Sequence, residues 1–355
     1  MTEIMKKLCL ALLIACLPFG CASQKTSEAP NSEDMPQTSE TDQTDGTSAL
    51  SEVQSIQLPG VEGRIDHMAV DSQEGRLFVA ALGNDTLEVV DLKAGEPTDE
   101  IKGLKEPQGV VYVPETDKLL VSNGEGASLS IYDGRSLDLI KEIELDEDPD
   151  NVRYDPATGY AYVGYGSGEK SALGVVDVEK GIKVTDIKLS GHPESFQLEG
   201  EGTRIFVNVP TSGQVEVVDT EKAAVVEEWT IGGSAKNFPM ALDETDNRLF
   251  VGTRSPAKLL VLDTGTGKTL TTLDSSGDAD DIFYDAKDKH IYVSGGEGTI
   301  SDFKQADPDN YSLISKVDTA EGARTSLFVE ESALLYLAVP HQGSQRAEIR
   351  VFQTT

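Results

Sequence analysis

The feature that most constrains the fold of this chain is an internal repeat that runs through residues 53–355. A short segment rich in aromatic and β-branched residues recurs at intervals of about 41–45 residues, which is the spacing of stacked or circular repeat units. The seven copies are residues 76–80, 118–122, 160–164, 204–208, 248–252, 290–294 and 334–338. A second strand-like segment follows each copy, and five of these seven end in Asp, whose side chain can close the following turn.

Each repeat has room for four short strands, which predicts one blade of a β-propeller. No segment has the 3.6-residue apolar period of a long helix. The last repeat ends at Thr355 after three strands, and one spare strand, residues 53–58, precedes the first repeat. We expect that spare strand to complete the last blade, because joining the chain ends in one sheet leaves no open edge in the ring. The sequence therefore predicts an all-β, seven-bladed propeller with four antiparallel strands per blade.

The first twenty residues are typical of a bacterial signal peptide. Lys6 and Lys7 precede an apolar run over residues 8–19, which is too short to span a bilayer. Cys21 follows a small residue at the end of this run, as in the lipobox of bacterial lipoproteins. Residues 1–20 are therefore predicted to be removed and Cys21 to carry the lipid. Cys16 is the alternative, since it has the better local match but leaves a very short signal.

Residues 21–52 are predicted to be a lipidated, disordered tether. Ser, Thr, Glu, Asp and Pro dominate this segment, and it has too few large apolar residues to form a core. Ala22, with no Asp after the cysteine, resembles the sorting signal for the outer membrane. We expect the protein in the bacterial cell envelope, held by its lipid on the outer membrane and facing the periplasm or the cell surface.

The charge of the chain excludes several classes of partner. Lys and Arg total 30 against 62 Asp and Glu, which gives a net charge of −32. Nucleic acid is excluded because its phosphates must be neutralised by basic residues, and the lipid is the sole predicted membrane contact. All three cysteines lie within the first 21 residues, so a disulfide framework, a zinc cluster or a covalent haem site is not expected in residues 53–355. We expect a monomer.

Residues 78–91, Phe-Val-Ala-Ala-Leu-Gly-Asn-Asp-Thr-Leu-Glu-Val-Val-Asp, resemble the Tyr-Val-Thr-Asn repeat of bacterial surface-layer and periplasmic propellers. The YncE-like proteins belong to that group. The resemblance covers nearly all of residues 53–355, although the Tyr-Val-Thr-Asn string is never intact. It implies the fold and leaves the function open, because the repeated residues are structural.

The start of each innermost strand is the position that lines the central mouth of a propeller. Most of these starts carry an acid or an amide, while the strands behind them are apolar. The predicted ligand-binding mouth comprises Asp66, His67, Gln108, Asp150, Asn151, Glu194, Asp280, Asp281 and Arg324. Arg324, the one cation other than His67 in this set, would either neutralise the acids or bind an anionic group.

The leading interpretation is a non-catalytic binding or interaction module, whose partner, an envelope protein or a small molecule, docks on a propeller face. The first alternative is a Ca²⁺-dependent lactonase or esterase, because hard oxygen ligands converge on the mouth. Its resemblance to gluconolactonase and paraoxonase propellers implies His67 as a general base. The same resemblance implies calcium ligands among Asp66, Asp150, Asn151, Glu194, Asp280 and Asp281. The second alternative is a propeller subunit of a periplasmic redox complex, as in quinoprotein dehydrogenases, although no redox-cofactor motif is present.

Overall fold

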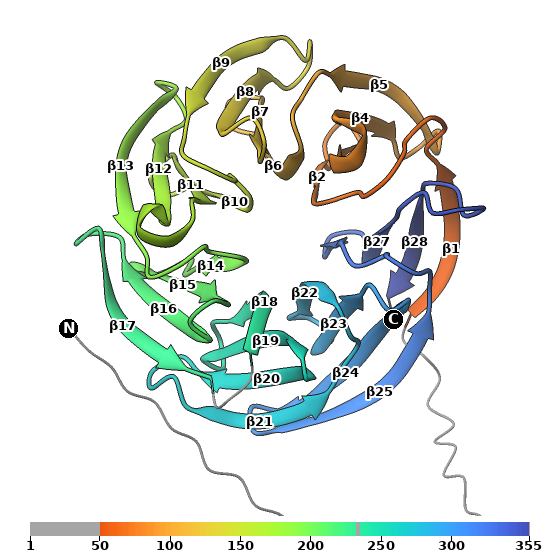
Figure 1. Cartoon of the computed structure of the whole chain (residues 1–355). Coiled ribbons are helices and arrows are strands. Elements are labelled where there is room, and N and C mark those ends of the chain that lie inside the picture. Colours follow the sequence, from red (N-terminus) through yellow and green to blue (C-terminus); the bar gives the residue numbers. More distant parts are fainter. Residues whose placement is uncertain (1–49, 232–234, 355) are drawn as a thin grey trace, which may run out of the picture. The chain divides into compact units, whose positions relative to one another are not determined.

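A computed structural model describes residues 50–231 and 235–354. The predicted signal peptide, Cys16, Cys21 and most of the predicted tether lie outside these residues. The described chain forms 28 strands in seven four-stranded antiparallel sheets, arranged as the blades of a ring (Figure 1). The innermost strands line cavities at the centre of this ring, which together form its channel. The predicted all-β, seven-bladed architecture is confirmed.

The first four complete blades follow the chain in order, each from the channel outward. Blade 1 contains β2 (Met68–Asp71), β3 (Arg76–Ala81), β4 (Thr86–Asp91) and β5 (Glu96–Lys102). Blade 2 contains β6 (Pro107–Val113), β7 (Lys118–Asn123), β8 (Ser128–Asp133) and β9 (Leu139–Glu144). Blade 3 contains β10 (Val152–Asp155), β11 (Tyr160–Tyr165), β12 (Ala172–Asp177) and β13 (Ile182–Lys188). Blade 4 contains β14 (Phe196–Leu198), β15 (Arg204–Val209), β16 (Gln214–Asp219) and β17 (Ala224–Thr230).

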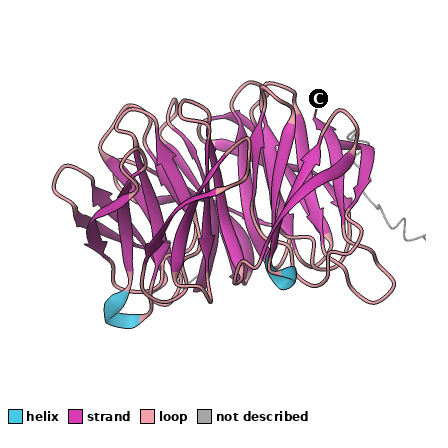
Figure 2. Cartoon of the chain, turned by 90° about the horizontal axis from the view of Figure 1, so that it is seen from above, coloured by secondary structure: helices cyan, strands magenta, loops and turns pink. Residues whose placement is uncertain are grey.

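The remaining blades complete the ring. Blade 5 contains β18 (Ala235–Asp243), β19 (Arg248–Ser255), β20 (Ala257–Asp263) and β21 (Thr269–Asp274). Blade 6 contains β22 (Ala279–Asp285), β23 (His290–Gly295), β24 (Thr299–Asp307) and β25 (Asn310–Asp318). Blade 7 contains β26 (Ser326–Val329), β27 (Leu334–Val339), β28 (Glu348–Thr354) and, outermost, β1 (Leu50–Gln57). Two three-residue 3-10 turns, η1 (Leu82–Asn84) and η2 (Gly168–Lys170), lie on the same face of the ring (Figure 2).

Among the described residues, no helix combines the length and the apolar character needed to cross a membrane.

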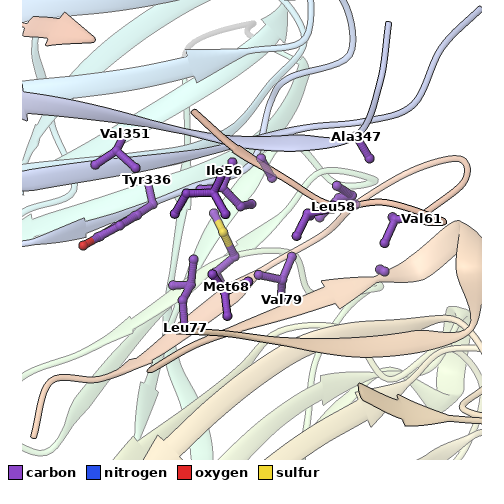
Figure 3. Packing of buried hydrophobic residues seen from close by; sticks show 14 of the residues in the cluster. Ile56, Leu58, Val61, Met68, Leu77, Val79, Tyr336, Ala347 and Val351 are labelled. Atoms are coloured by element: carbon purple, nitrogen blue, oxygen red, sulfur yellow. The ribbon is translucent and has the colours of Figure 1, made fainter. Parts of the chain in front are cut away.

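The chain ends close the ring as predicted, because β1 pairs antiparallel with β28. The strand begins at Leu50, so residues 50–52 belong to the propeller and not to the tether to which they were assigned. Leu50 is buried in the core between blades 6 and 7, whereas Ile56 is buried in the core between blades 7 and 1 (Figure 3). A β-bulge between Glu52 and Gln54 inserts one residue into β1. The side chains of Leu50 and Ile56, on either side of this bulge, can therefore point to opposite faces of the sheet.

Seven hydrophobic clusters, one between each pair of neighbouring blades, form the core. The second strand of a blade lies between two neighbouring blades and is buried on both faces, as in β15, where five of six residues are buried. This double burial explains why the second strands read as unbroken apolar runs. The outermost strands bury little, and β17 has one buried residue among seven.

The Asp that recurs at the end of the third strands, absent from β28, closes the following turn in several blades. Asp91 accepts hydrogen bonds from the backbone N–H groups of Lys93 and Ala94, both at 2.8 Å. Asp133 repeats the arrangement with Arg135 and Ser136, at 3.0 and 2.7 Å. The repeat signal in the sequence therefore includes the turn as well as the strands.

Replacing Gly267 with alanine is expected to destabilise the fold by roughly 2–4 kcal/mol, because the new Cβ would clash with Trp229 and strain the backbone. Gly267 has φ of +68°, and a Cβ there would lie 2.2 Å from Cγ of the buried Trp229. Trp229 is the single tryptophan of the chain, so its fluorescence can follow urea unfolding directly. Gly103→Ala is the matched control, since Gly103 has φ of +76° and no neighbouring atom within 4 Å. Equal losses in both variants would show that the contact with Trp229 does not contribute.

Candidate functional site

The innermost strands begin around a polar cavity of about 200 Å³ at one end of the channel, which we call the mouth. All seven blades contribute side chains to it. Seven of the nine predicted residues line it: Asp66, His67, Gln108, Asp150, Glu194, Asp280 and Arg324. Asn151 and Asp281 do not. Asn151 is 3% exposed and its Oδ1 has no hydrogen-bond partner among the described residues, and Asp281 lines the next cavity along the channel.

Equivalent positions of different blades place these side chains at the mouth. The backbone N–H of Asp66 donates to the carbonyl of Ala80 at 2.7 Å. The N–H groups of Asp150 and Glu194 donate in the same way to Gly164 and Asn208, at 2.9 and 3.0 Å. The acceptor is in each case the fifth residue of the repeated apolar segment. The shared bond fixes where each innermost strand starts, which is why aligning the repeats located the mouth.

The acids of the mouth are paired with more cations than the sequence indicated. Asp66 accepts a hydrogen bond from Arg64 at 2.7 Å. Asp280 forms an ion pair with Arg254 and lies 3.8 Å from Arg324. The prediction that Arg324 is the one cation besides His67 at the mouth is therefore wrong.

Arg324 and Arg254 also share a third acid, Asp278, at 2.8 and 3.5 Å. The Arg254 guanidinium stacks 3.6 Å from the ring centre of Phe238. Of the two roles open to Arg324, these contacts favour neutralisation of the acids. Arg64 and Arg254 were missed because neither occupies a strand start. Arg64 lies in the loop before β2 and Arg254 lies near the end of β19, so the signal for both is an Arg close in sequence or across the blade to a strand start.

His67 lies between two carboxylates and is protonated at neutral pH. Its Nε2 is 3.6 Å from Asp66 and its Nδ1 is 3.5 Å from Asp281. Burial lowers the pKa of His67, but Asp281 and Asp66 more than offset this and raise it to about 10. A protonated imidazole cannot accept a proton, so the structure does not support His67 as a general base.

The six predicted calcium ligands do not fit a metal site. Asp66 and Asp280 are held by arginines, and Asp281 accepts the backbone N–H of Ser326 at 2.8 Å. Asn151 does not line the mouth. Within residues 50–231 and 235–354, no three His, Cys, Asp or Glu side chains are grouped so that they could hold a metal ion.

Asp150 and Glu194 are the exceptions among the acids of the mouth. Neither side chain has a hydrogen bond or an ion pair to any residue that the structure describes, and Asp150 is 9% exposed. Burial raises the pKa of Asp150 to about 8, with Glu194 and Asp66 adding to the effect. Burial, with Asp280 adding to it, raises the pKa of Glu194 to about 8 as well. The mouth therefore contains two carboxyl groups without a direct hydrogen bond or ion pair, and the nearby charges of Arg254 on Glu194 and of His67 and His192 on Asp150 only partly offset the rise of their pKa values.

A second cavity of about 430 Å³, which we call the lower cavity, continues the channel beyond His67. Side chains from all seven innermost strands line it, and most are apolar. The polar exceptions are His67, Arg153, Gln197, Asp281 and Ser326. Of these, His67 and Asp281 were predicted from the sequence, whereas Arg153, Gln197 and Ser326 lie one or two positions beyond the aligned strand starts.

Comparisons with known proteins support the fold. No protein-family model matches the chain. YncE of Salmonella typhimurium (strain LT2) is 21% identical over 301 residues, which cover 79% of this chain and 84% of the relative. YncE of Salmonella typhi is 21% identical over 304 residues with the same coverage, and both relatives are described as uncharacterized.

Two solved structures match with a TM-score of 0.72 each. Hydrazine synthase of Kuenenia stuttgartiensis is 18% identical and aligns over 84% of this chain and 99% of its own. A chain of a mitotic checkpoint complex is 13% identical and aligns over 93% of this chain and 99% of its own. At these identities the likeness shows the fold alone. The molecule is a seven-bladed β-propeller with a polar mouth. Within that class it is YncE-like.

Proposed function

We propose that this protein is a non-catalytic binding module of the bacterial cell envelope, tethered by a lipid on Cys21, that takes a cationic group into its mouth. The group is an ammonium or a guanidinium, carried by a small molecule or by a Lys or Arg side chain of a partner protein. The observation that carries the proposal is a pair of carboxyl groups with no hydrogen bond or ion pair, that of the buried Asp150 and that of the half-buried Glu194.

The mouth favours a cation for electrostatic reasons. Asp66 and Asp280 already have arginine partners, so these acids gain little from a further positive charge. Asp150 and Glu194 have no direct ion pair, although Arg254 acts on Glu194 and His67 and His192 act on Asp150 through space. A bound N–H cation in direct contact would therefore stabilise the ionised form of both. Binding should therefore release protons at neutral pH, since both pKa values lie at about 8.

No observation favours the two alternatives. The hydrolase needs a calcium site and a neutral histidine, and the predicted ligands and His67 fit neither requirement. For the redox-subunit alternative, the similarity to hydrazine synthase amounts to 18% sequence identity. A similarity at that level concerns the fold and does not favour a redox role.

The test is the thermal unfolding of the intact protein in detergent with methylammonium, methylguanidinium or a lysine tripeptide blocked at both ends, against NaCl at matched ionic strength. A cation at about one hundred times its Kd should stabilise the native state by roughly 2.7 kcal/mol. The gain should disappear in the double variant Asp150→Asn, Glu194→Gln. Stabilisation by methylammonium or methylguanidinium indicates a small-molecule ligand, and stabilisation by the peptide alone indicates a partner side chain.

The matched control is Glu96→Gln with Asp99→Asn, which removes the same two types of charge from the exposed face of β5. This control should respond to the cations as the wild type does. Equal responses in all three proteins, or no response beyond that to NaCl, would refute the proposal. A response to Ca²⁺ that EDTA reverses and that requires Asp150 would instead favour the calcium-dependent alternative.

A further inference from the structure

The lower cavity has the size and lining of a small-molecule site. Its volume of about 430 Å³ lies within the range of known ligand pockets. Apolar side chains from opposite sides of the channel face it, among them Met68, Val110, Leu242, Ile282 and Leu327. Such walls favour a ligand with an apolar portion. The few polar groups among them determine which polar or charged group the ligand has.

Arg153, on β10, is the unusual polar group of this cavity. Of the arginines in the described residues, it is the one that is neither exposed nor paired with a carboxylate. Its Nη1 donates to the carbonyl of Val152 at 2.9 Å, and its guanidinium stacks 5.7 Å from the ring centre of Phe196. Burial lowers the pKa of Arg153, yet a guanidinium remains charged at any physiological pH. Most of its donors therefore have no acceptor in the protein.

The charge around the lower cavity is complementary to an anion. His67 and Arg153 are both positive, and Asp281 is the one acid among the lining residues. That acid is already engaged, because it lies 3.5 Å from His67 and accepts the Ser326 N–H. In a chain with a net charge of −32, the residues that line this cavity carry one more positive than negative charge. A carboxylate matches the planar, forked donor arrangement of a free guanidinium.

We propose that the lower cavity binds a small organic carboxylate with an apolar chain, its carboxylate on Arg153 and its chain against the apolar walls. This site adjoins the cation site of the mouth, with His67 lining both cavities, but its proposed ligand contacts Arg153 and not Asp150 or Glu194. The two can be tested independently, because the ligands have opposite charges.

The experiment is calorimetric titration of the intact protein in detergent with acetate, butyrate, hexanoate and 1-hexanol, each below its micelle-forming concentration. Affinity should rise from acetate to hexanoate as more of the chain reaches the apolar walls. Arg153→Met should weaken hexanoate binding at least tenfold and leave the weaker binding of 1-hexanol unchanged. Arg153→Lys keeps the charge but not the forked donors, and should lose less affinity than Arg153→Met.

Arg135→Met is the matched control, because Arg135 is exposed on a turn of blade 2. It should bind hexanoate as the wild type does. Trp229 fluorescence reports whether each variant is folded. If Arg153→Met does not fold, Arg153→Lys and Arg153→Gln are used in its place. The proposal is overturned if the wild type does not bind hexanoate at millimolar concentration. It is also overturned if the folded Arg153 variants bind as tightly as the wild type, or if acetate binds as tightly as hexanoate.

Discussion

Replacing Ile56 with alanine is expected to lower the free energy of unfolding by about 2–5 kcal/mol, the usual effect of truncating a fully buried Ile. Ile56 is 1% exposed and packs among Met68, Leu77 and Tyr336, at the joint between the first and last blades (Figure 3). The truncation should also weaken the closure of the ring, because Ile56 lies on β1, which pairs with β28. Urea unfolding followed by Trp229 fluorescence measures the loss of stability.

Val53→Ala is the control for this prediction, because Val53 lies on the same strand but is 57% exposed. Its effect should stay within about 0.5 kcal/mol. Deleting residues 50–57 should remove cooperative unfolding altogether and promote aggregation, because it leaves β28 as an open edge. If Ile56→Ala and Val53→Ala lower the free energy of unfolding by similar amounts, burial of Ile56 on β1 does not stabilise the closed ring.

Blade number, strand order and ring closure could be predicted because burial alternates regularly from strand to strand within a blade. The second strands are enclosed by both neighbours and read as apolar runs, so their seven copies stand out. The start of β1 could not be predicted. Leu50 is followed by Ser51 and Glu52, and nothing local indicates a strand. Its burial depends on a core cluster that includes Phe352, about three hundred residues further along the chain.

The position of the candidate site could be predicted from the sequence, but the number of positive charges that face its acids could not. Successive side chains of an extended strand point to opposite sides, so neighbours at a strand start need not share a cavity. Asp150 lines the mouth and Asn151 does not. Asp280 lines the mouth and Asp281 lines the lower cavity. Arg64 and Arg254 could not be predicted because their long side chains reach the mouth from a loop and from the end of β19, outside the aligned strand starts.

Despite its acidity, the protein is expected to become less stable as the pH rises from about 5.5 to about 9. Asp150 and Glu194 have pKa values of about 8 when folded, against ordinary values of 3.8 and 4.5. The native state therefore holds protons that the unfolded chain releases. The stabilising effect of these protons is fully present below about pH 4 and is lost as the pH rises through about 8.

The contribution of His67 to stability also falls as the pH rises, but over a higher pH range. Its pKa is raised from 6.5 to about 10, so its contribution is fully present below about pH 6.5 and is lost as the pH rises through about 10. Between its unfolded and folded pKa values, each of the three groups can lower the free energy of unfolding by up to roughly 1.4 kcal/mol per pH unit. Exposed carboxylates titrate mainly below this range, so they add little to the slope.

Urea unfolding at fixed ionic strength and at several pH values measures this slope, and two variants separate its sources. Asp150→Asn with Glu194→Gln should flatten the curve between about pH 5.5 and 8, while the His67 contribution at higher pH remains. Glu96→Gln with Asp99→Asn should leave the whole slope in place, because those acids are exposed. A stability that is flat or rises with pH in the wild type would mean that Asp150 and Glu194 are already ionised. The same protons link this result to binding, because a cation at the mouth must displace them. Its affinity should therefore rise over the pH range in which the empty protein loses stability.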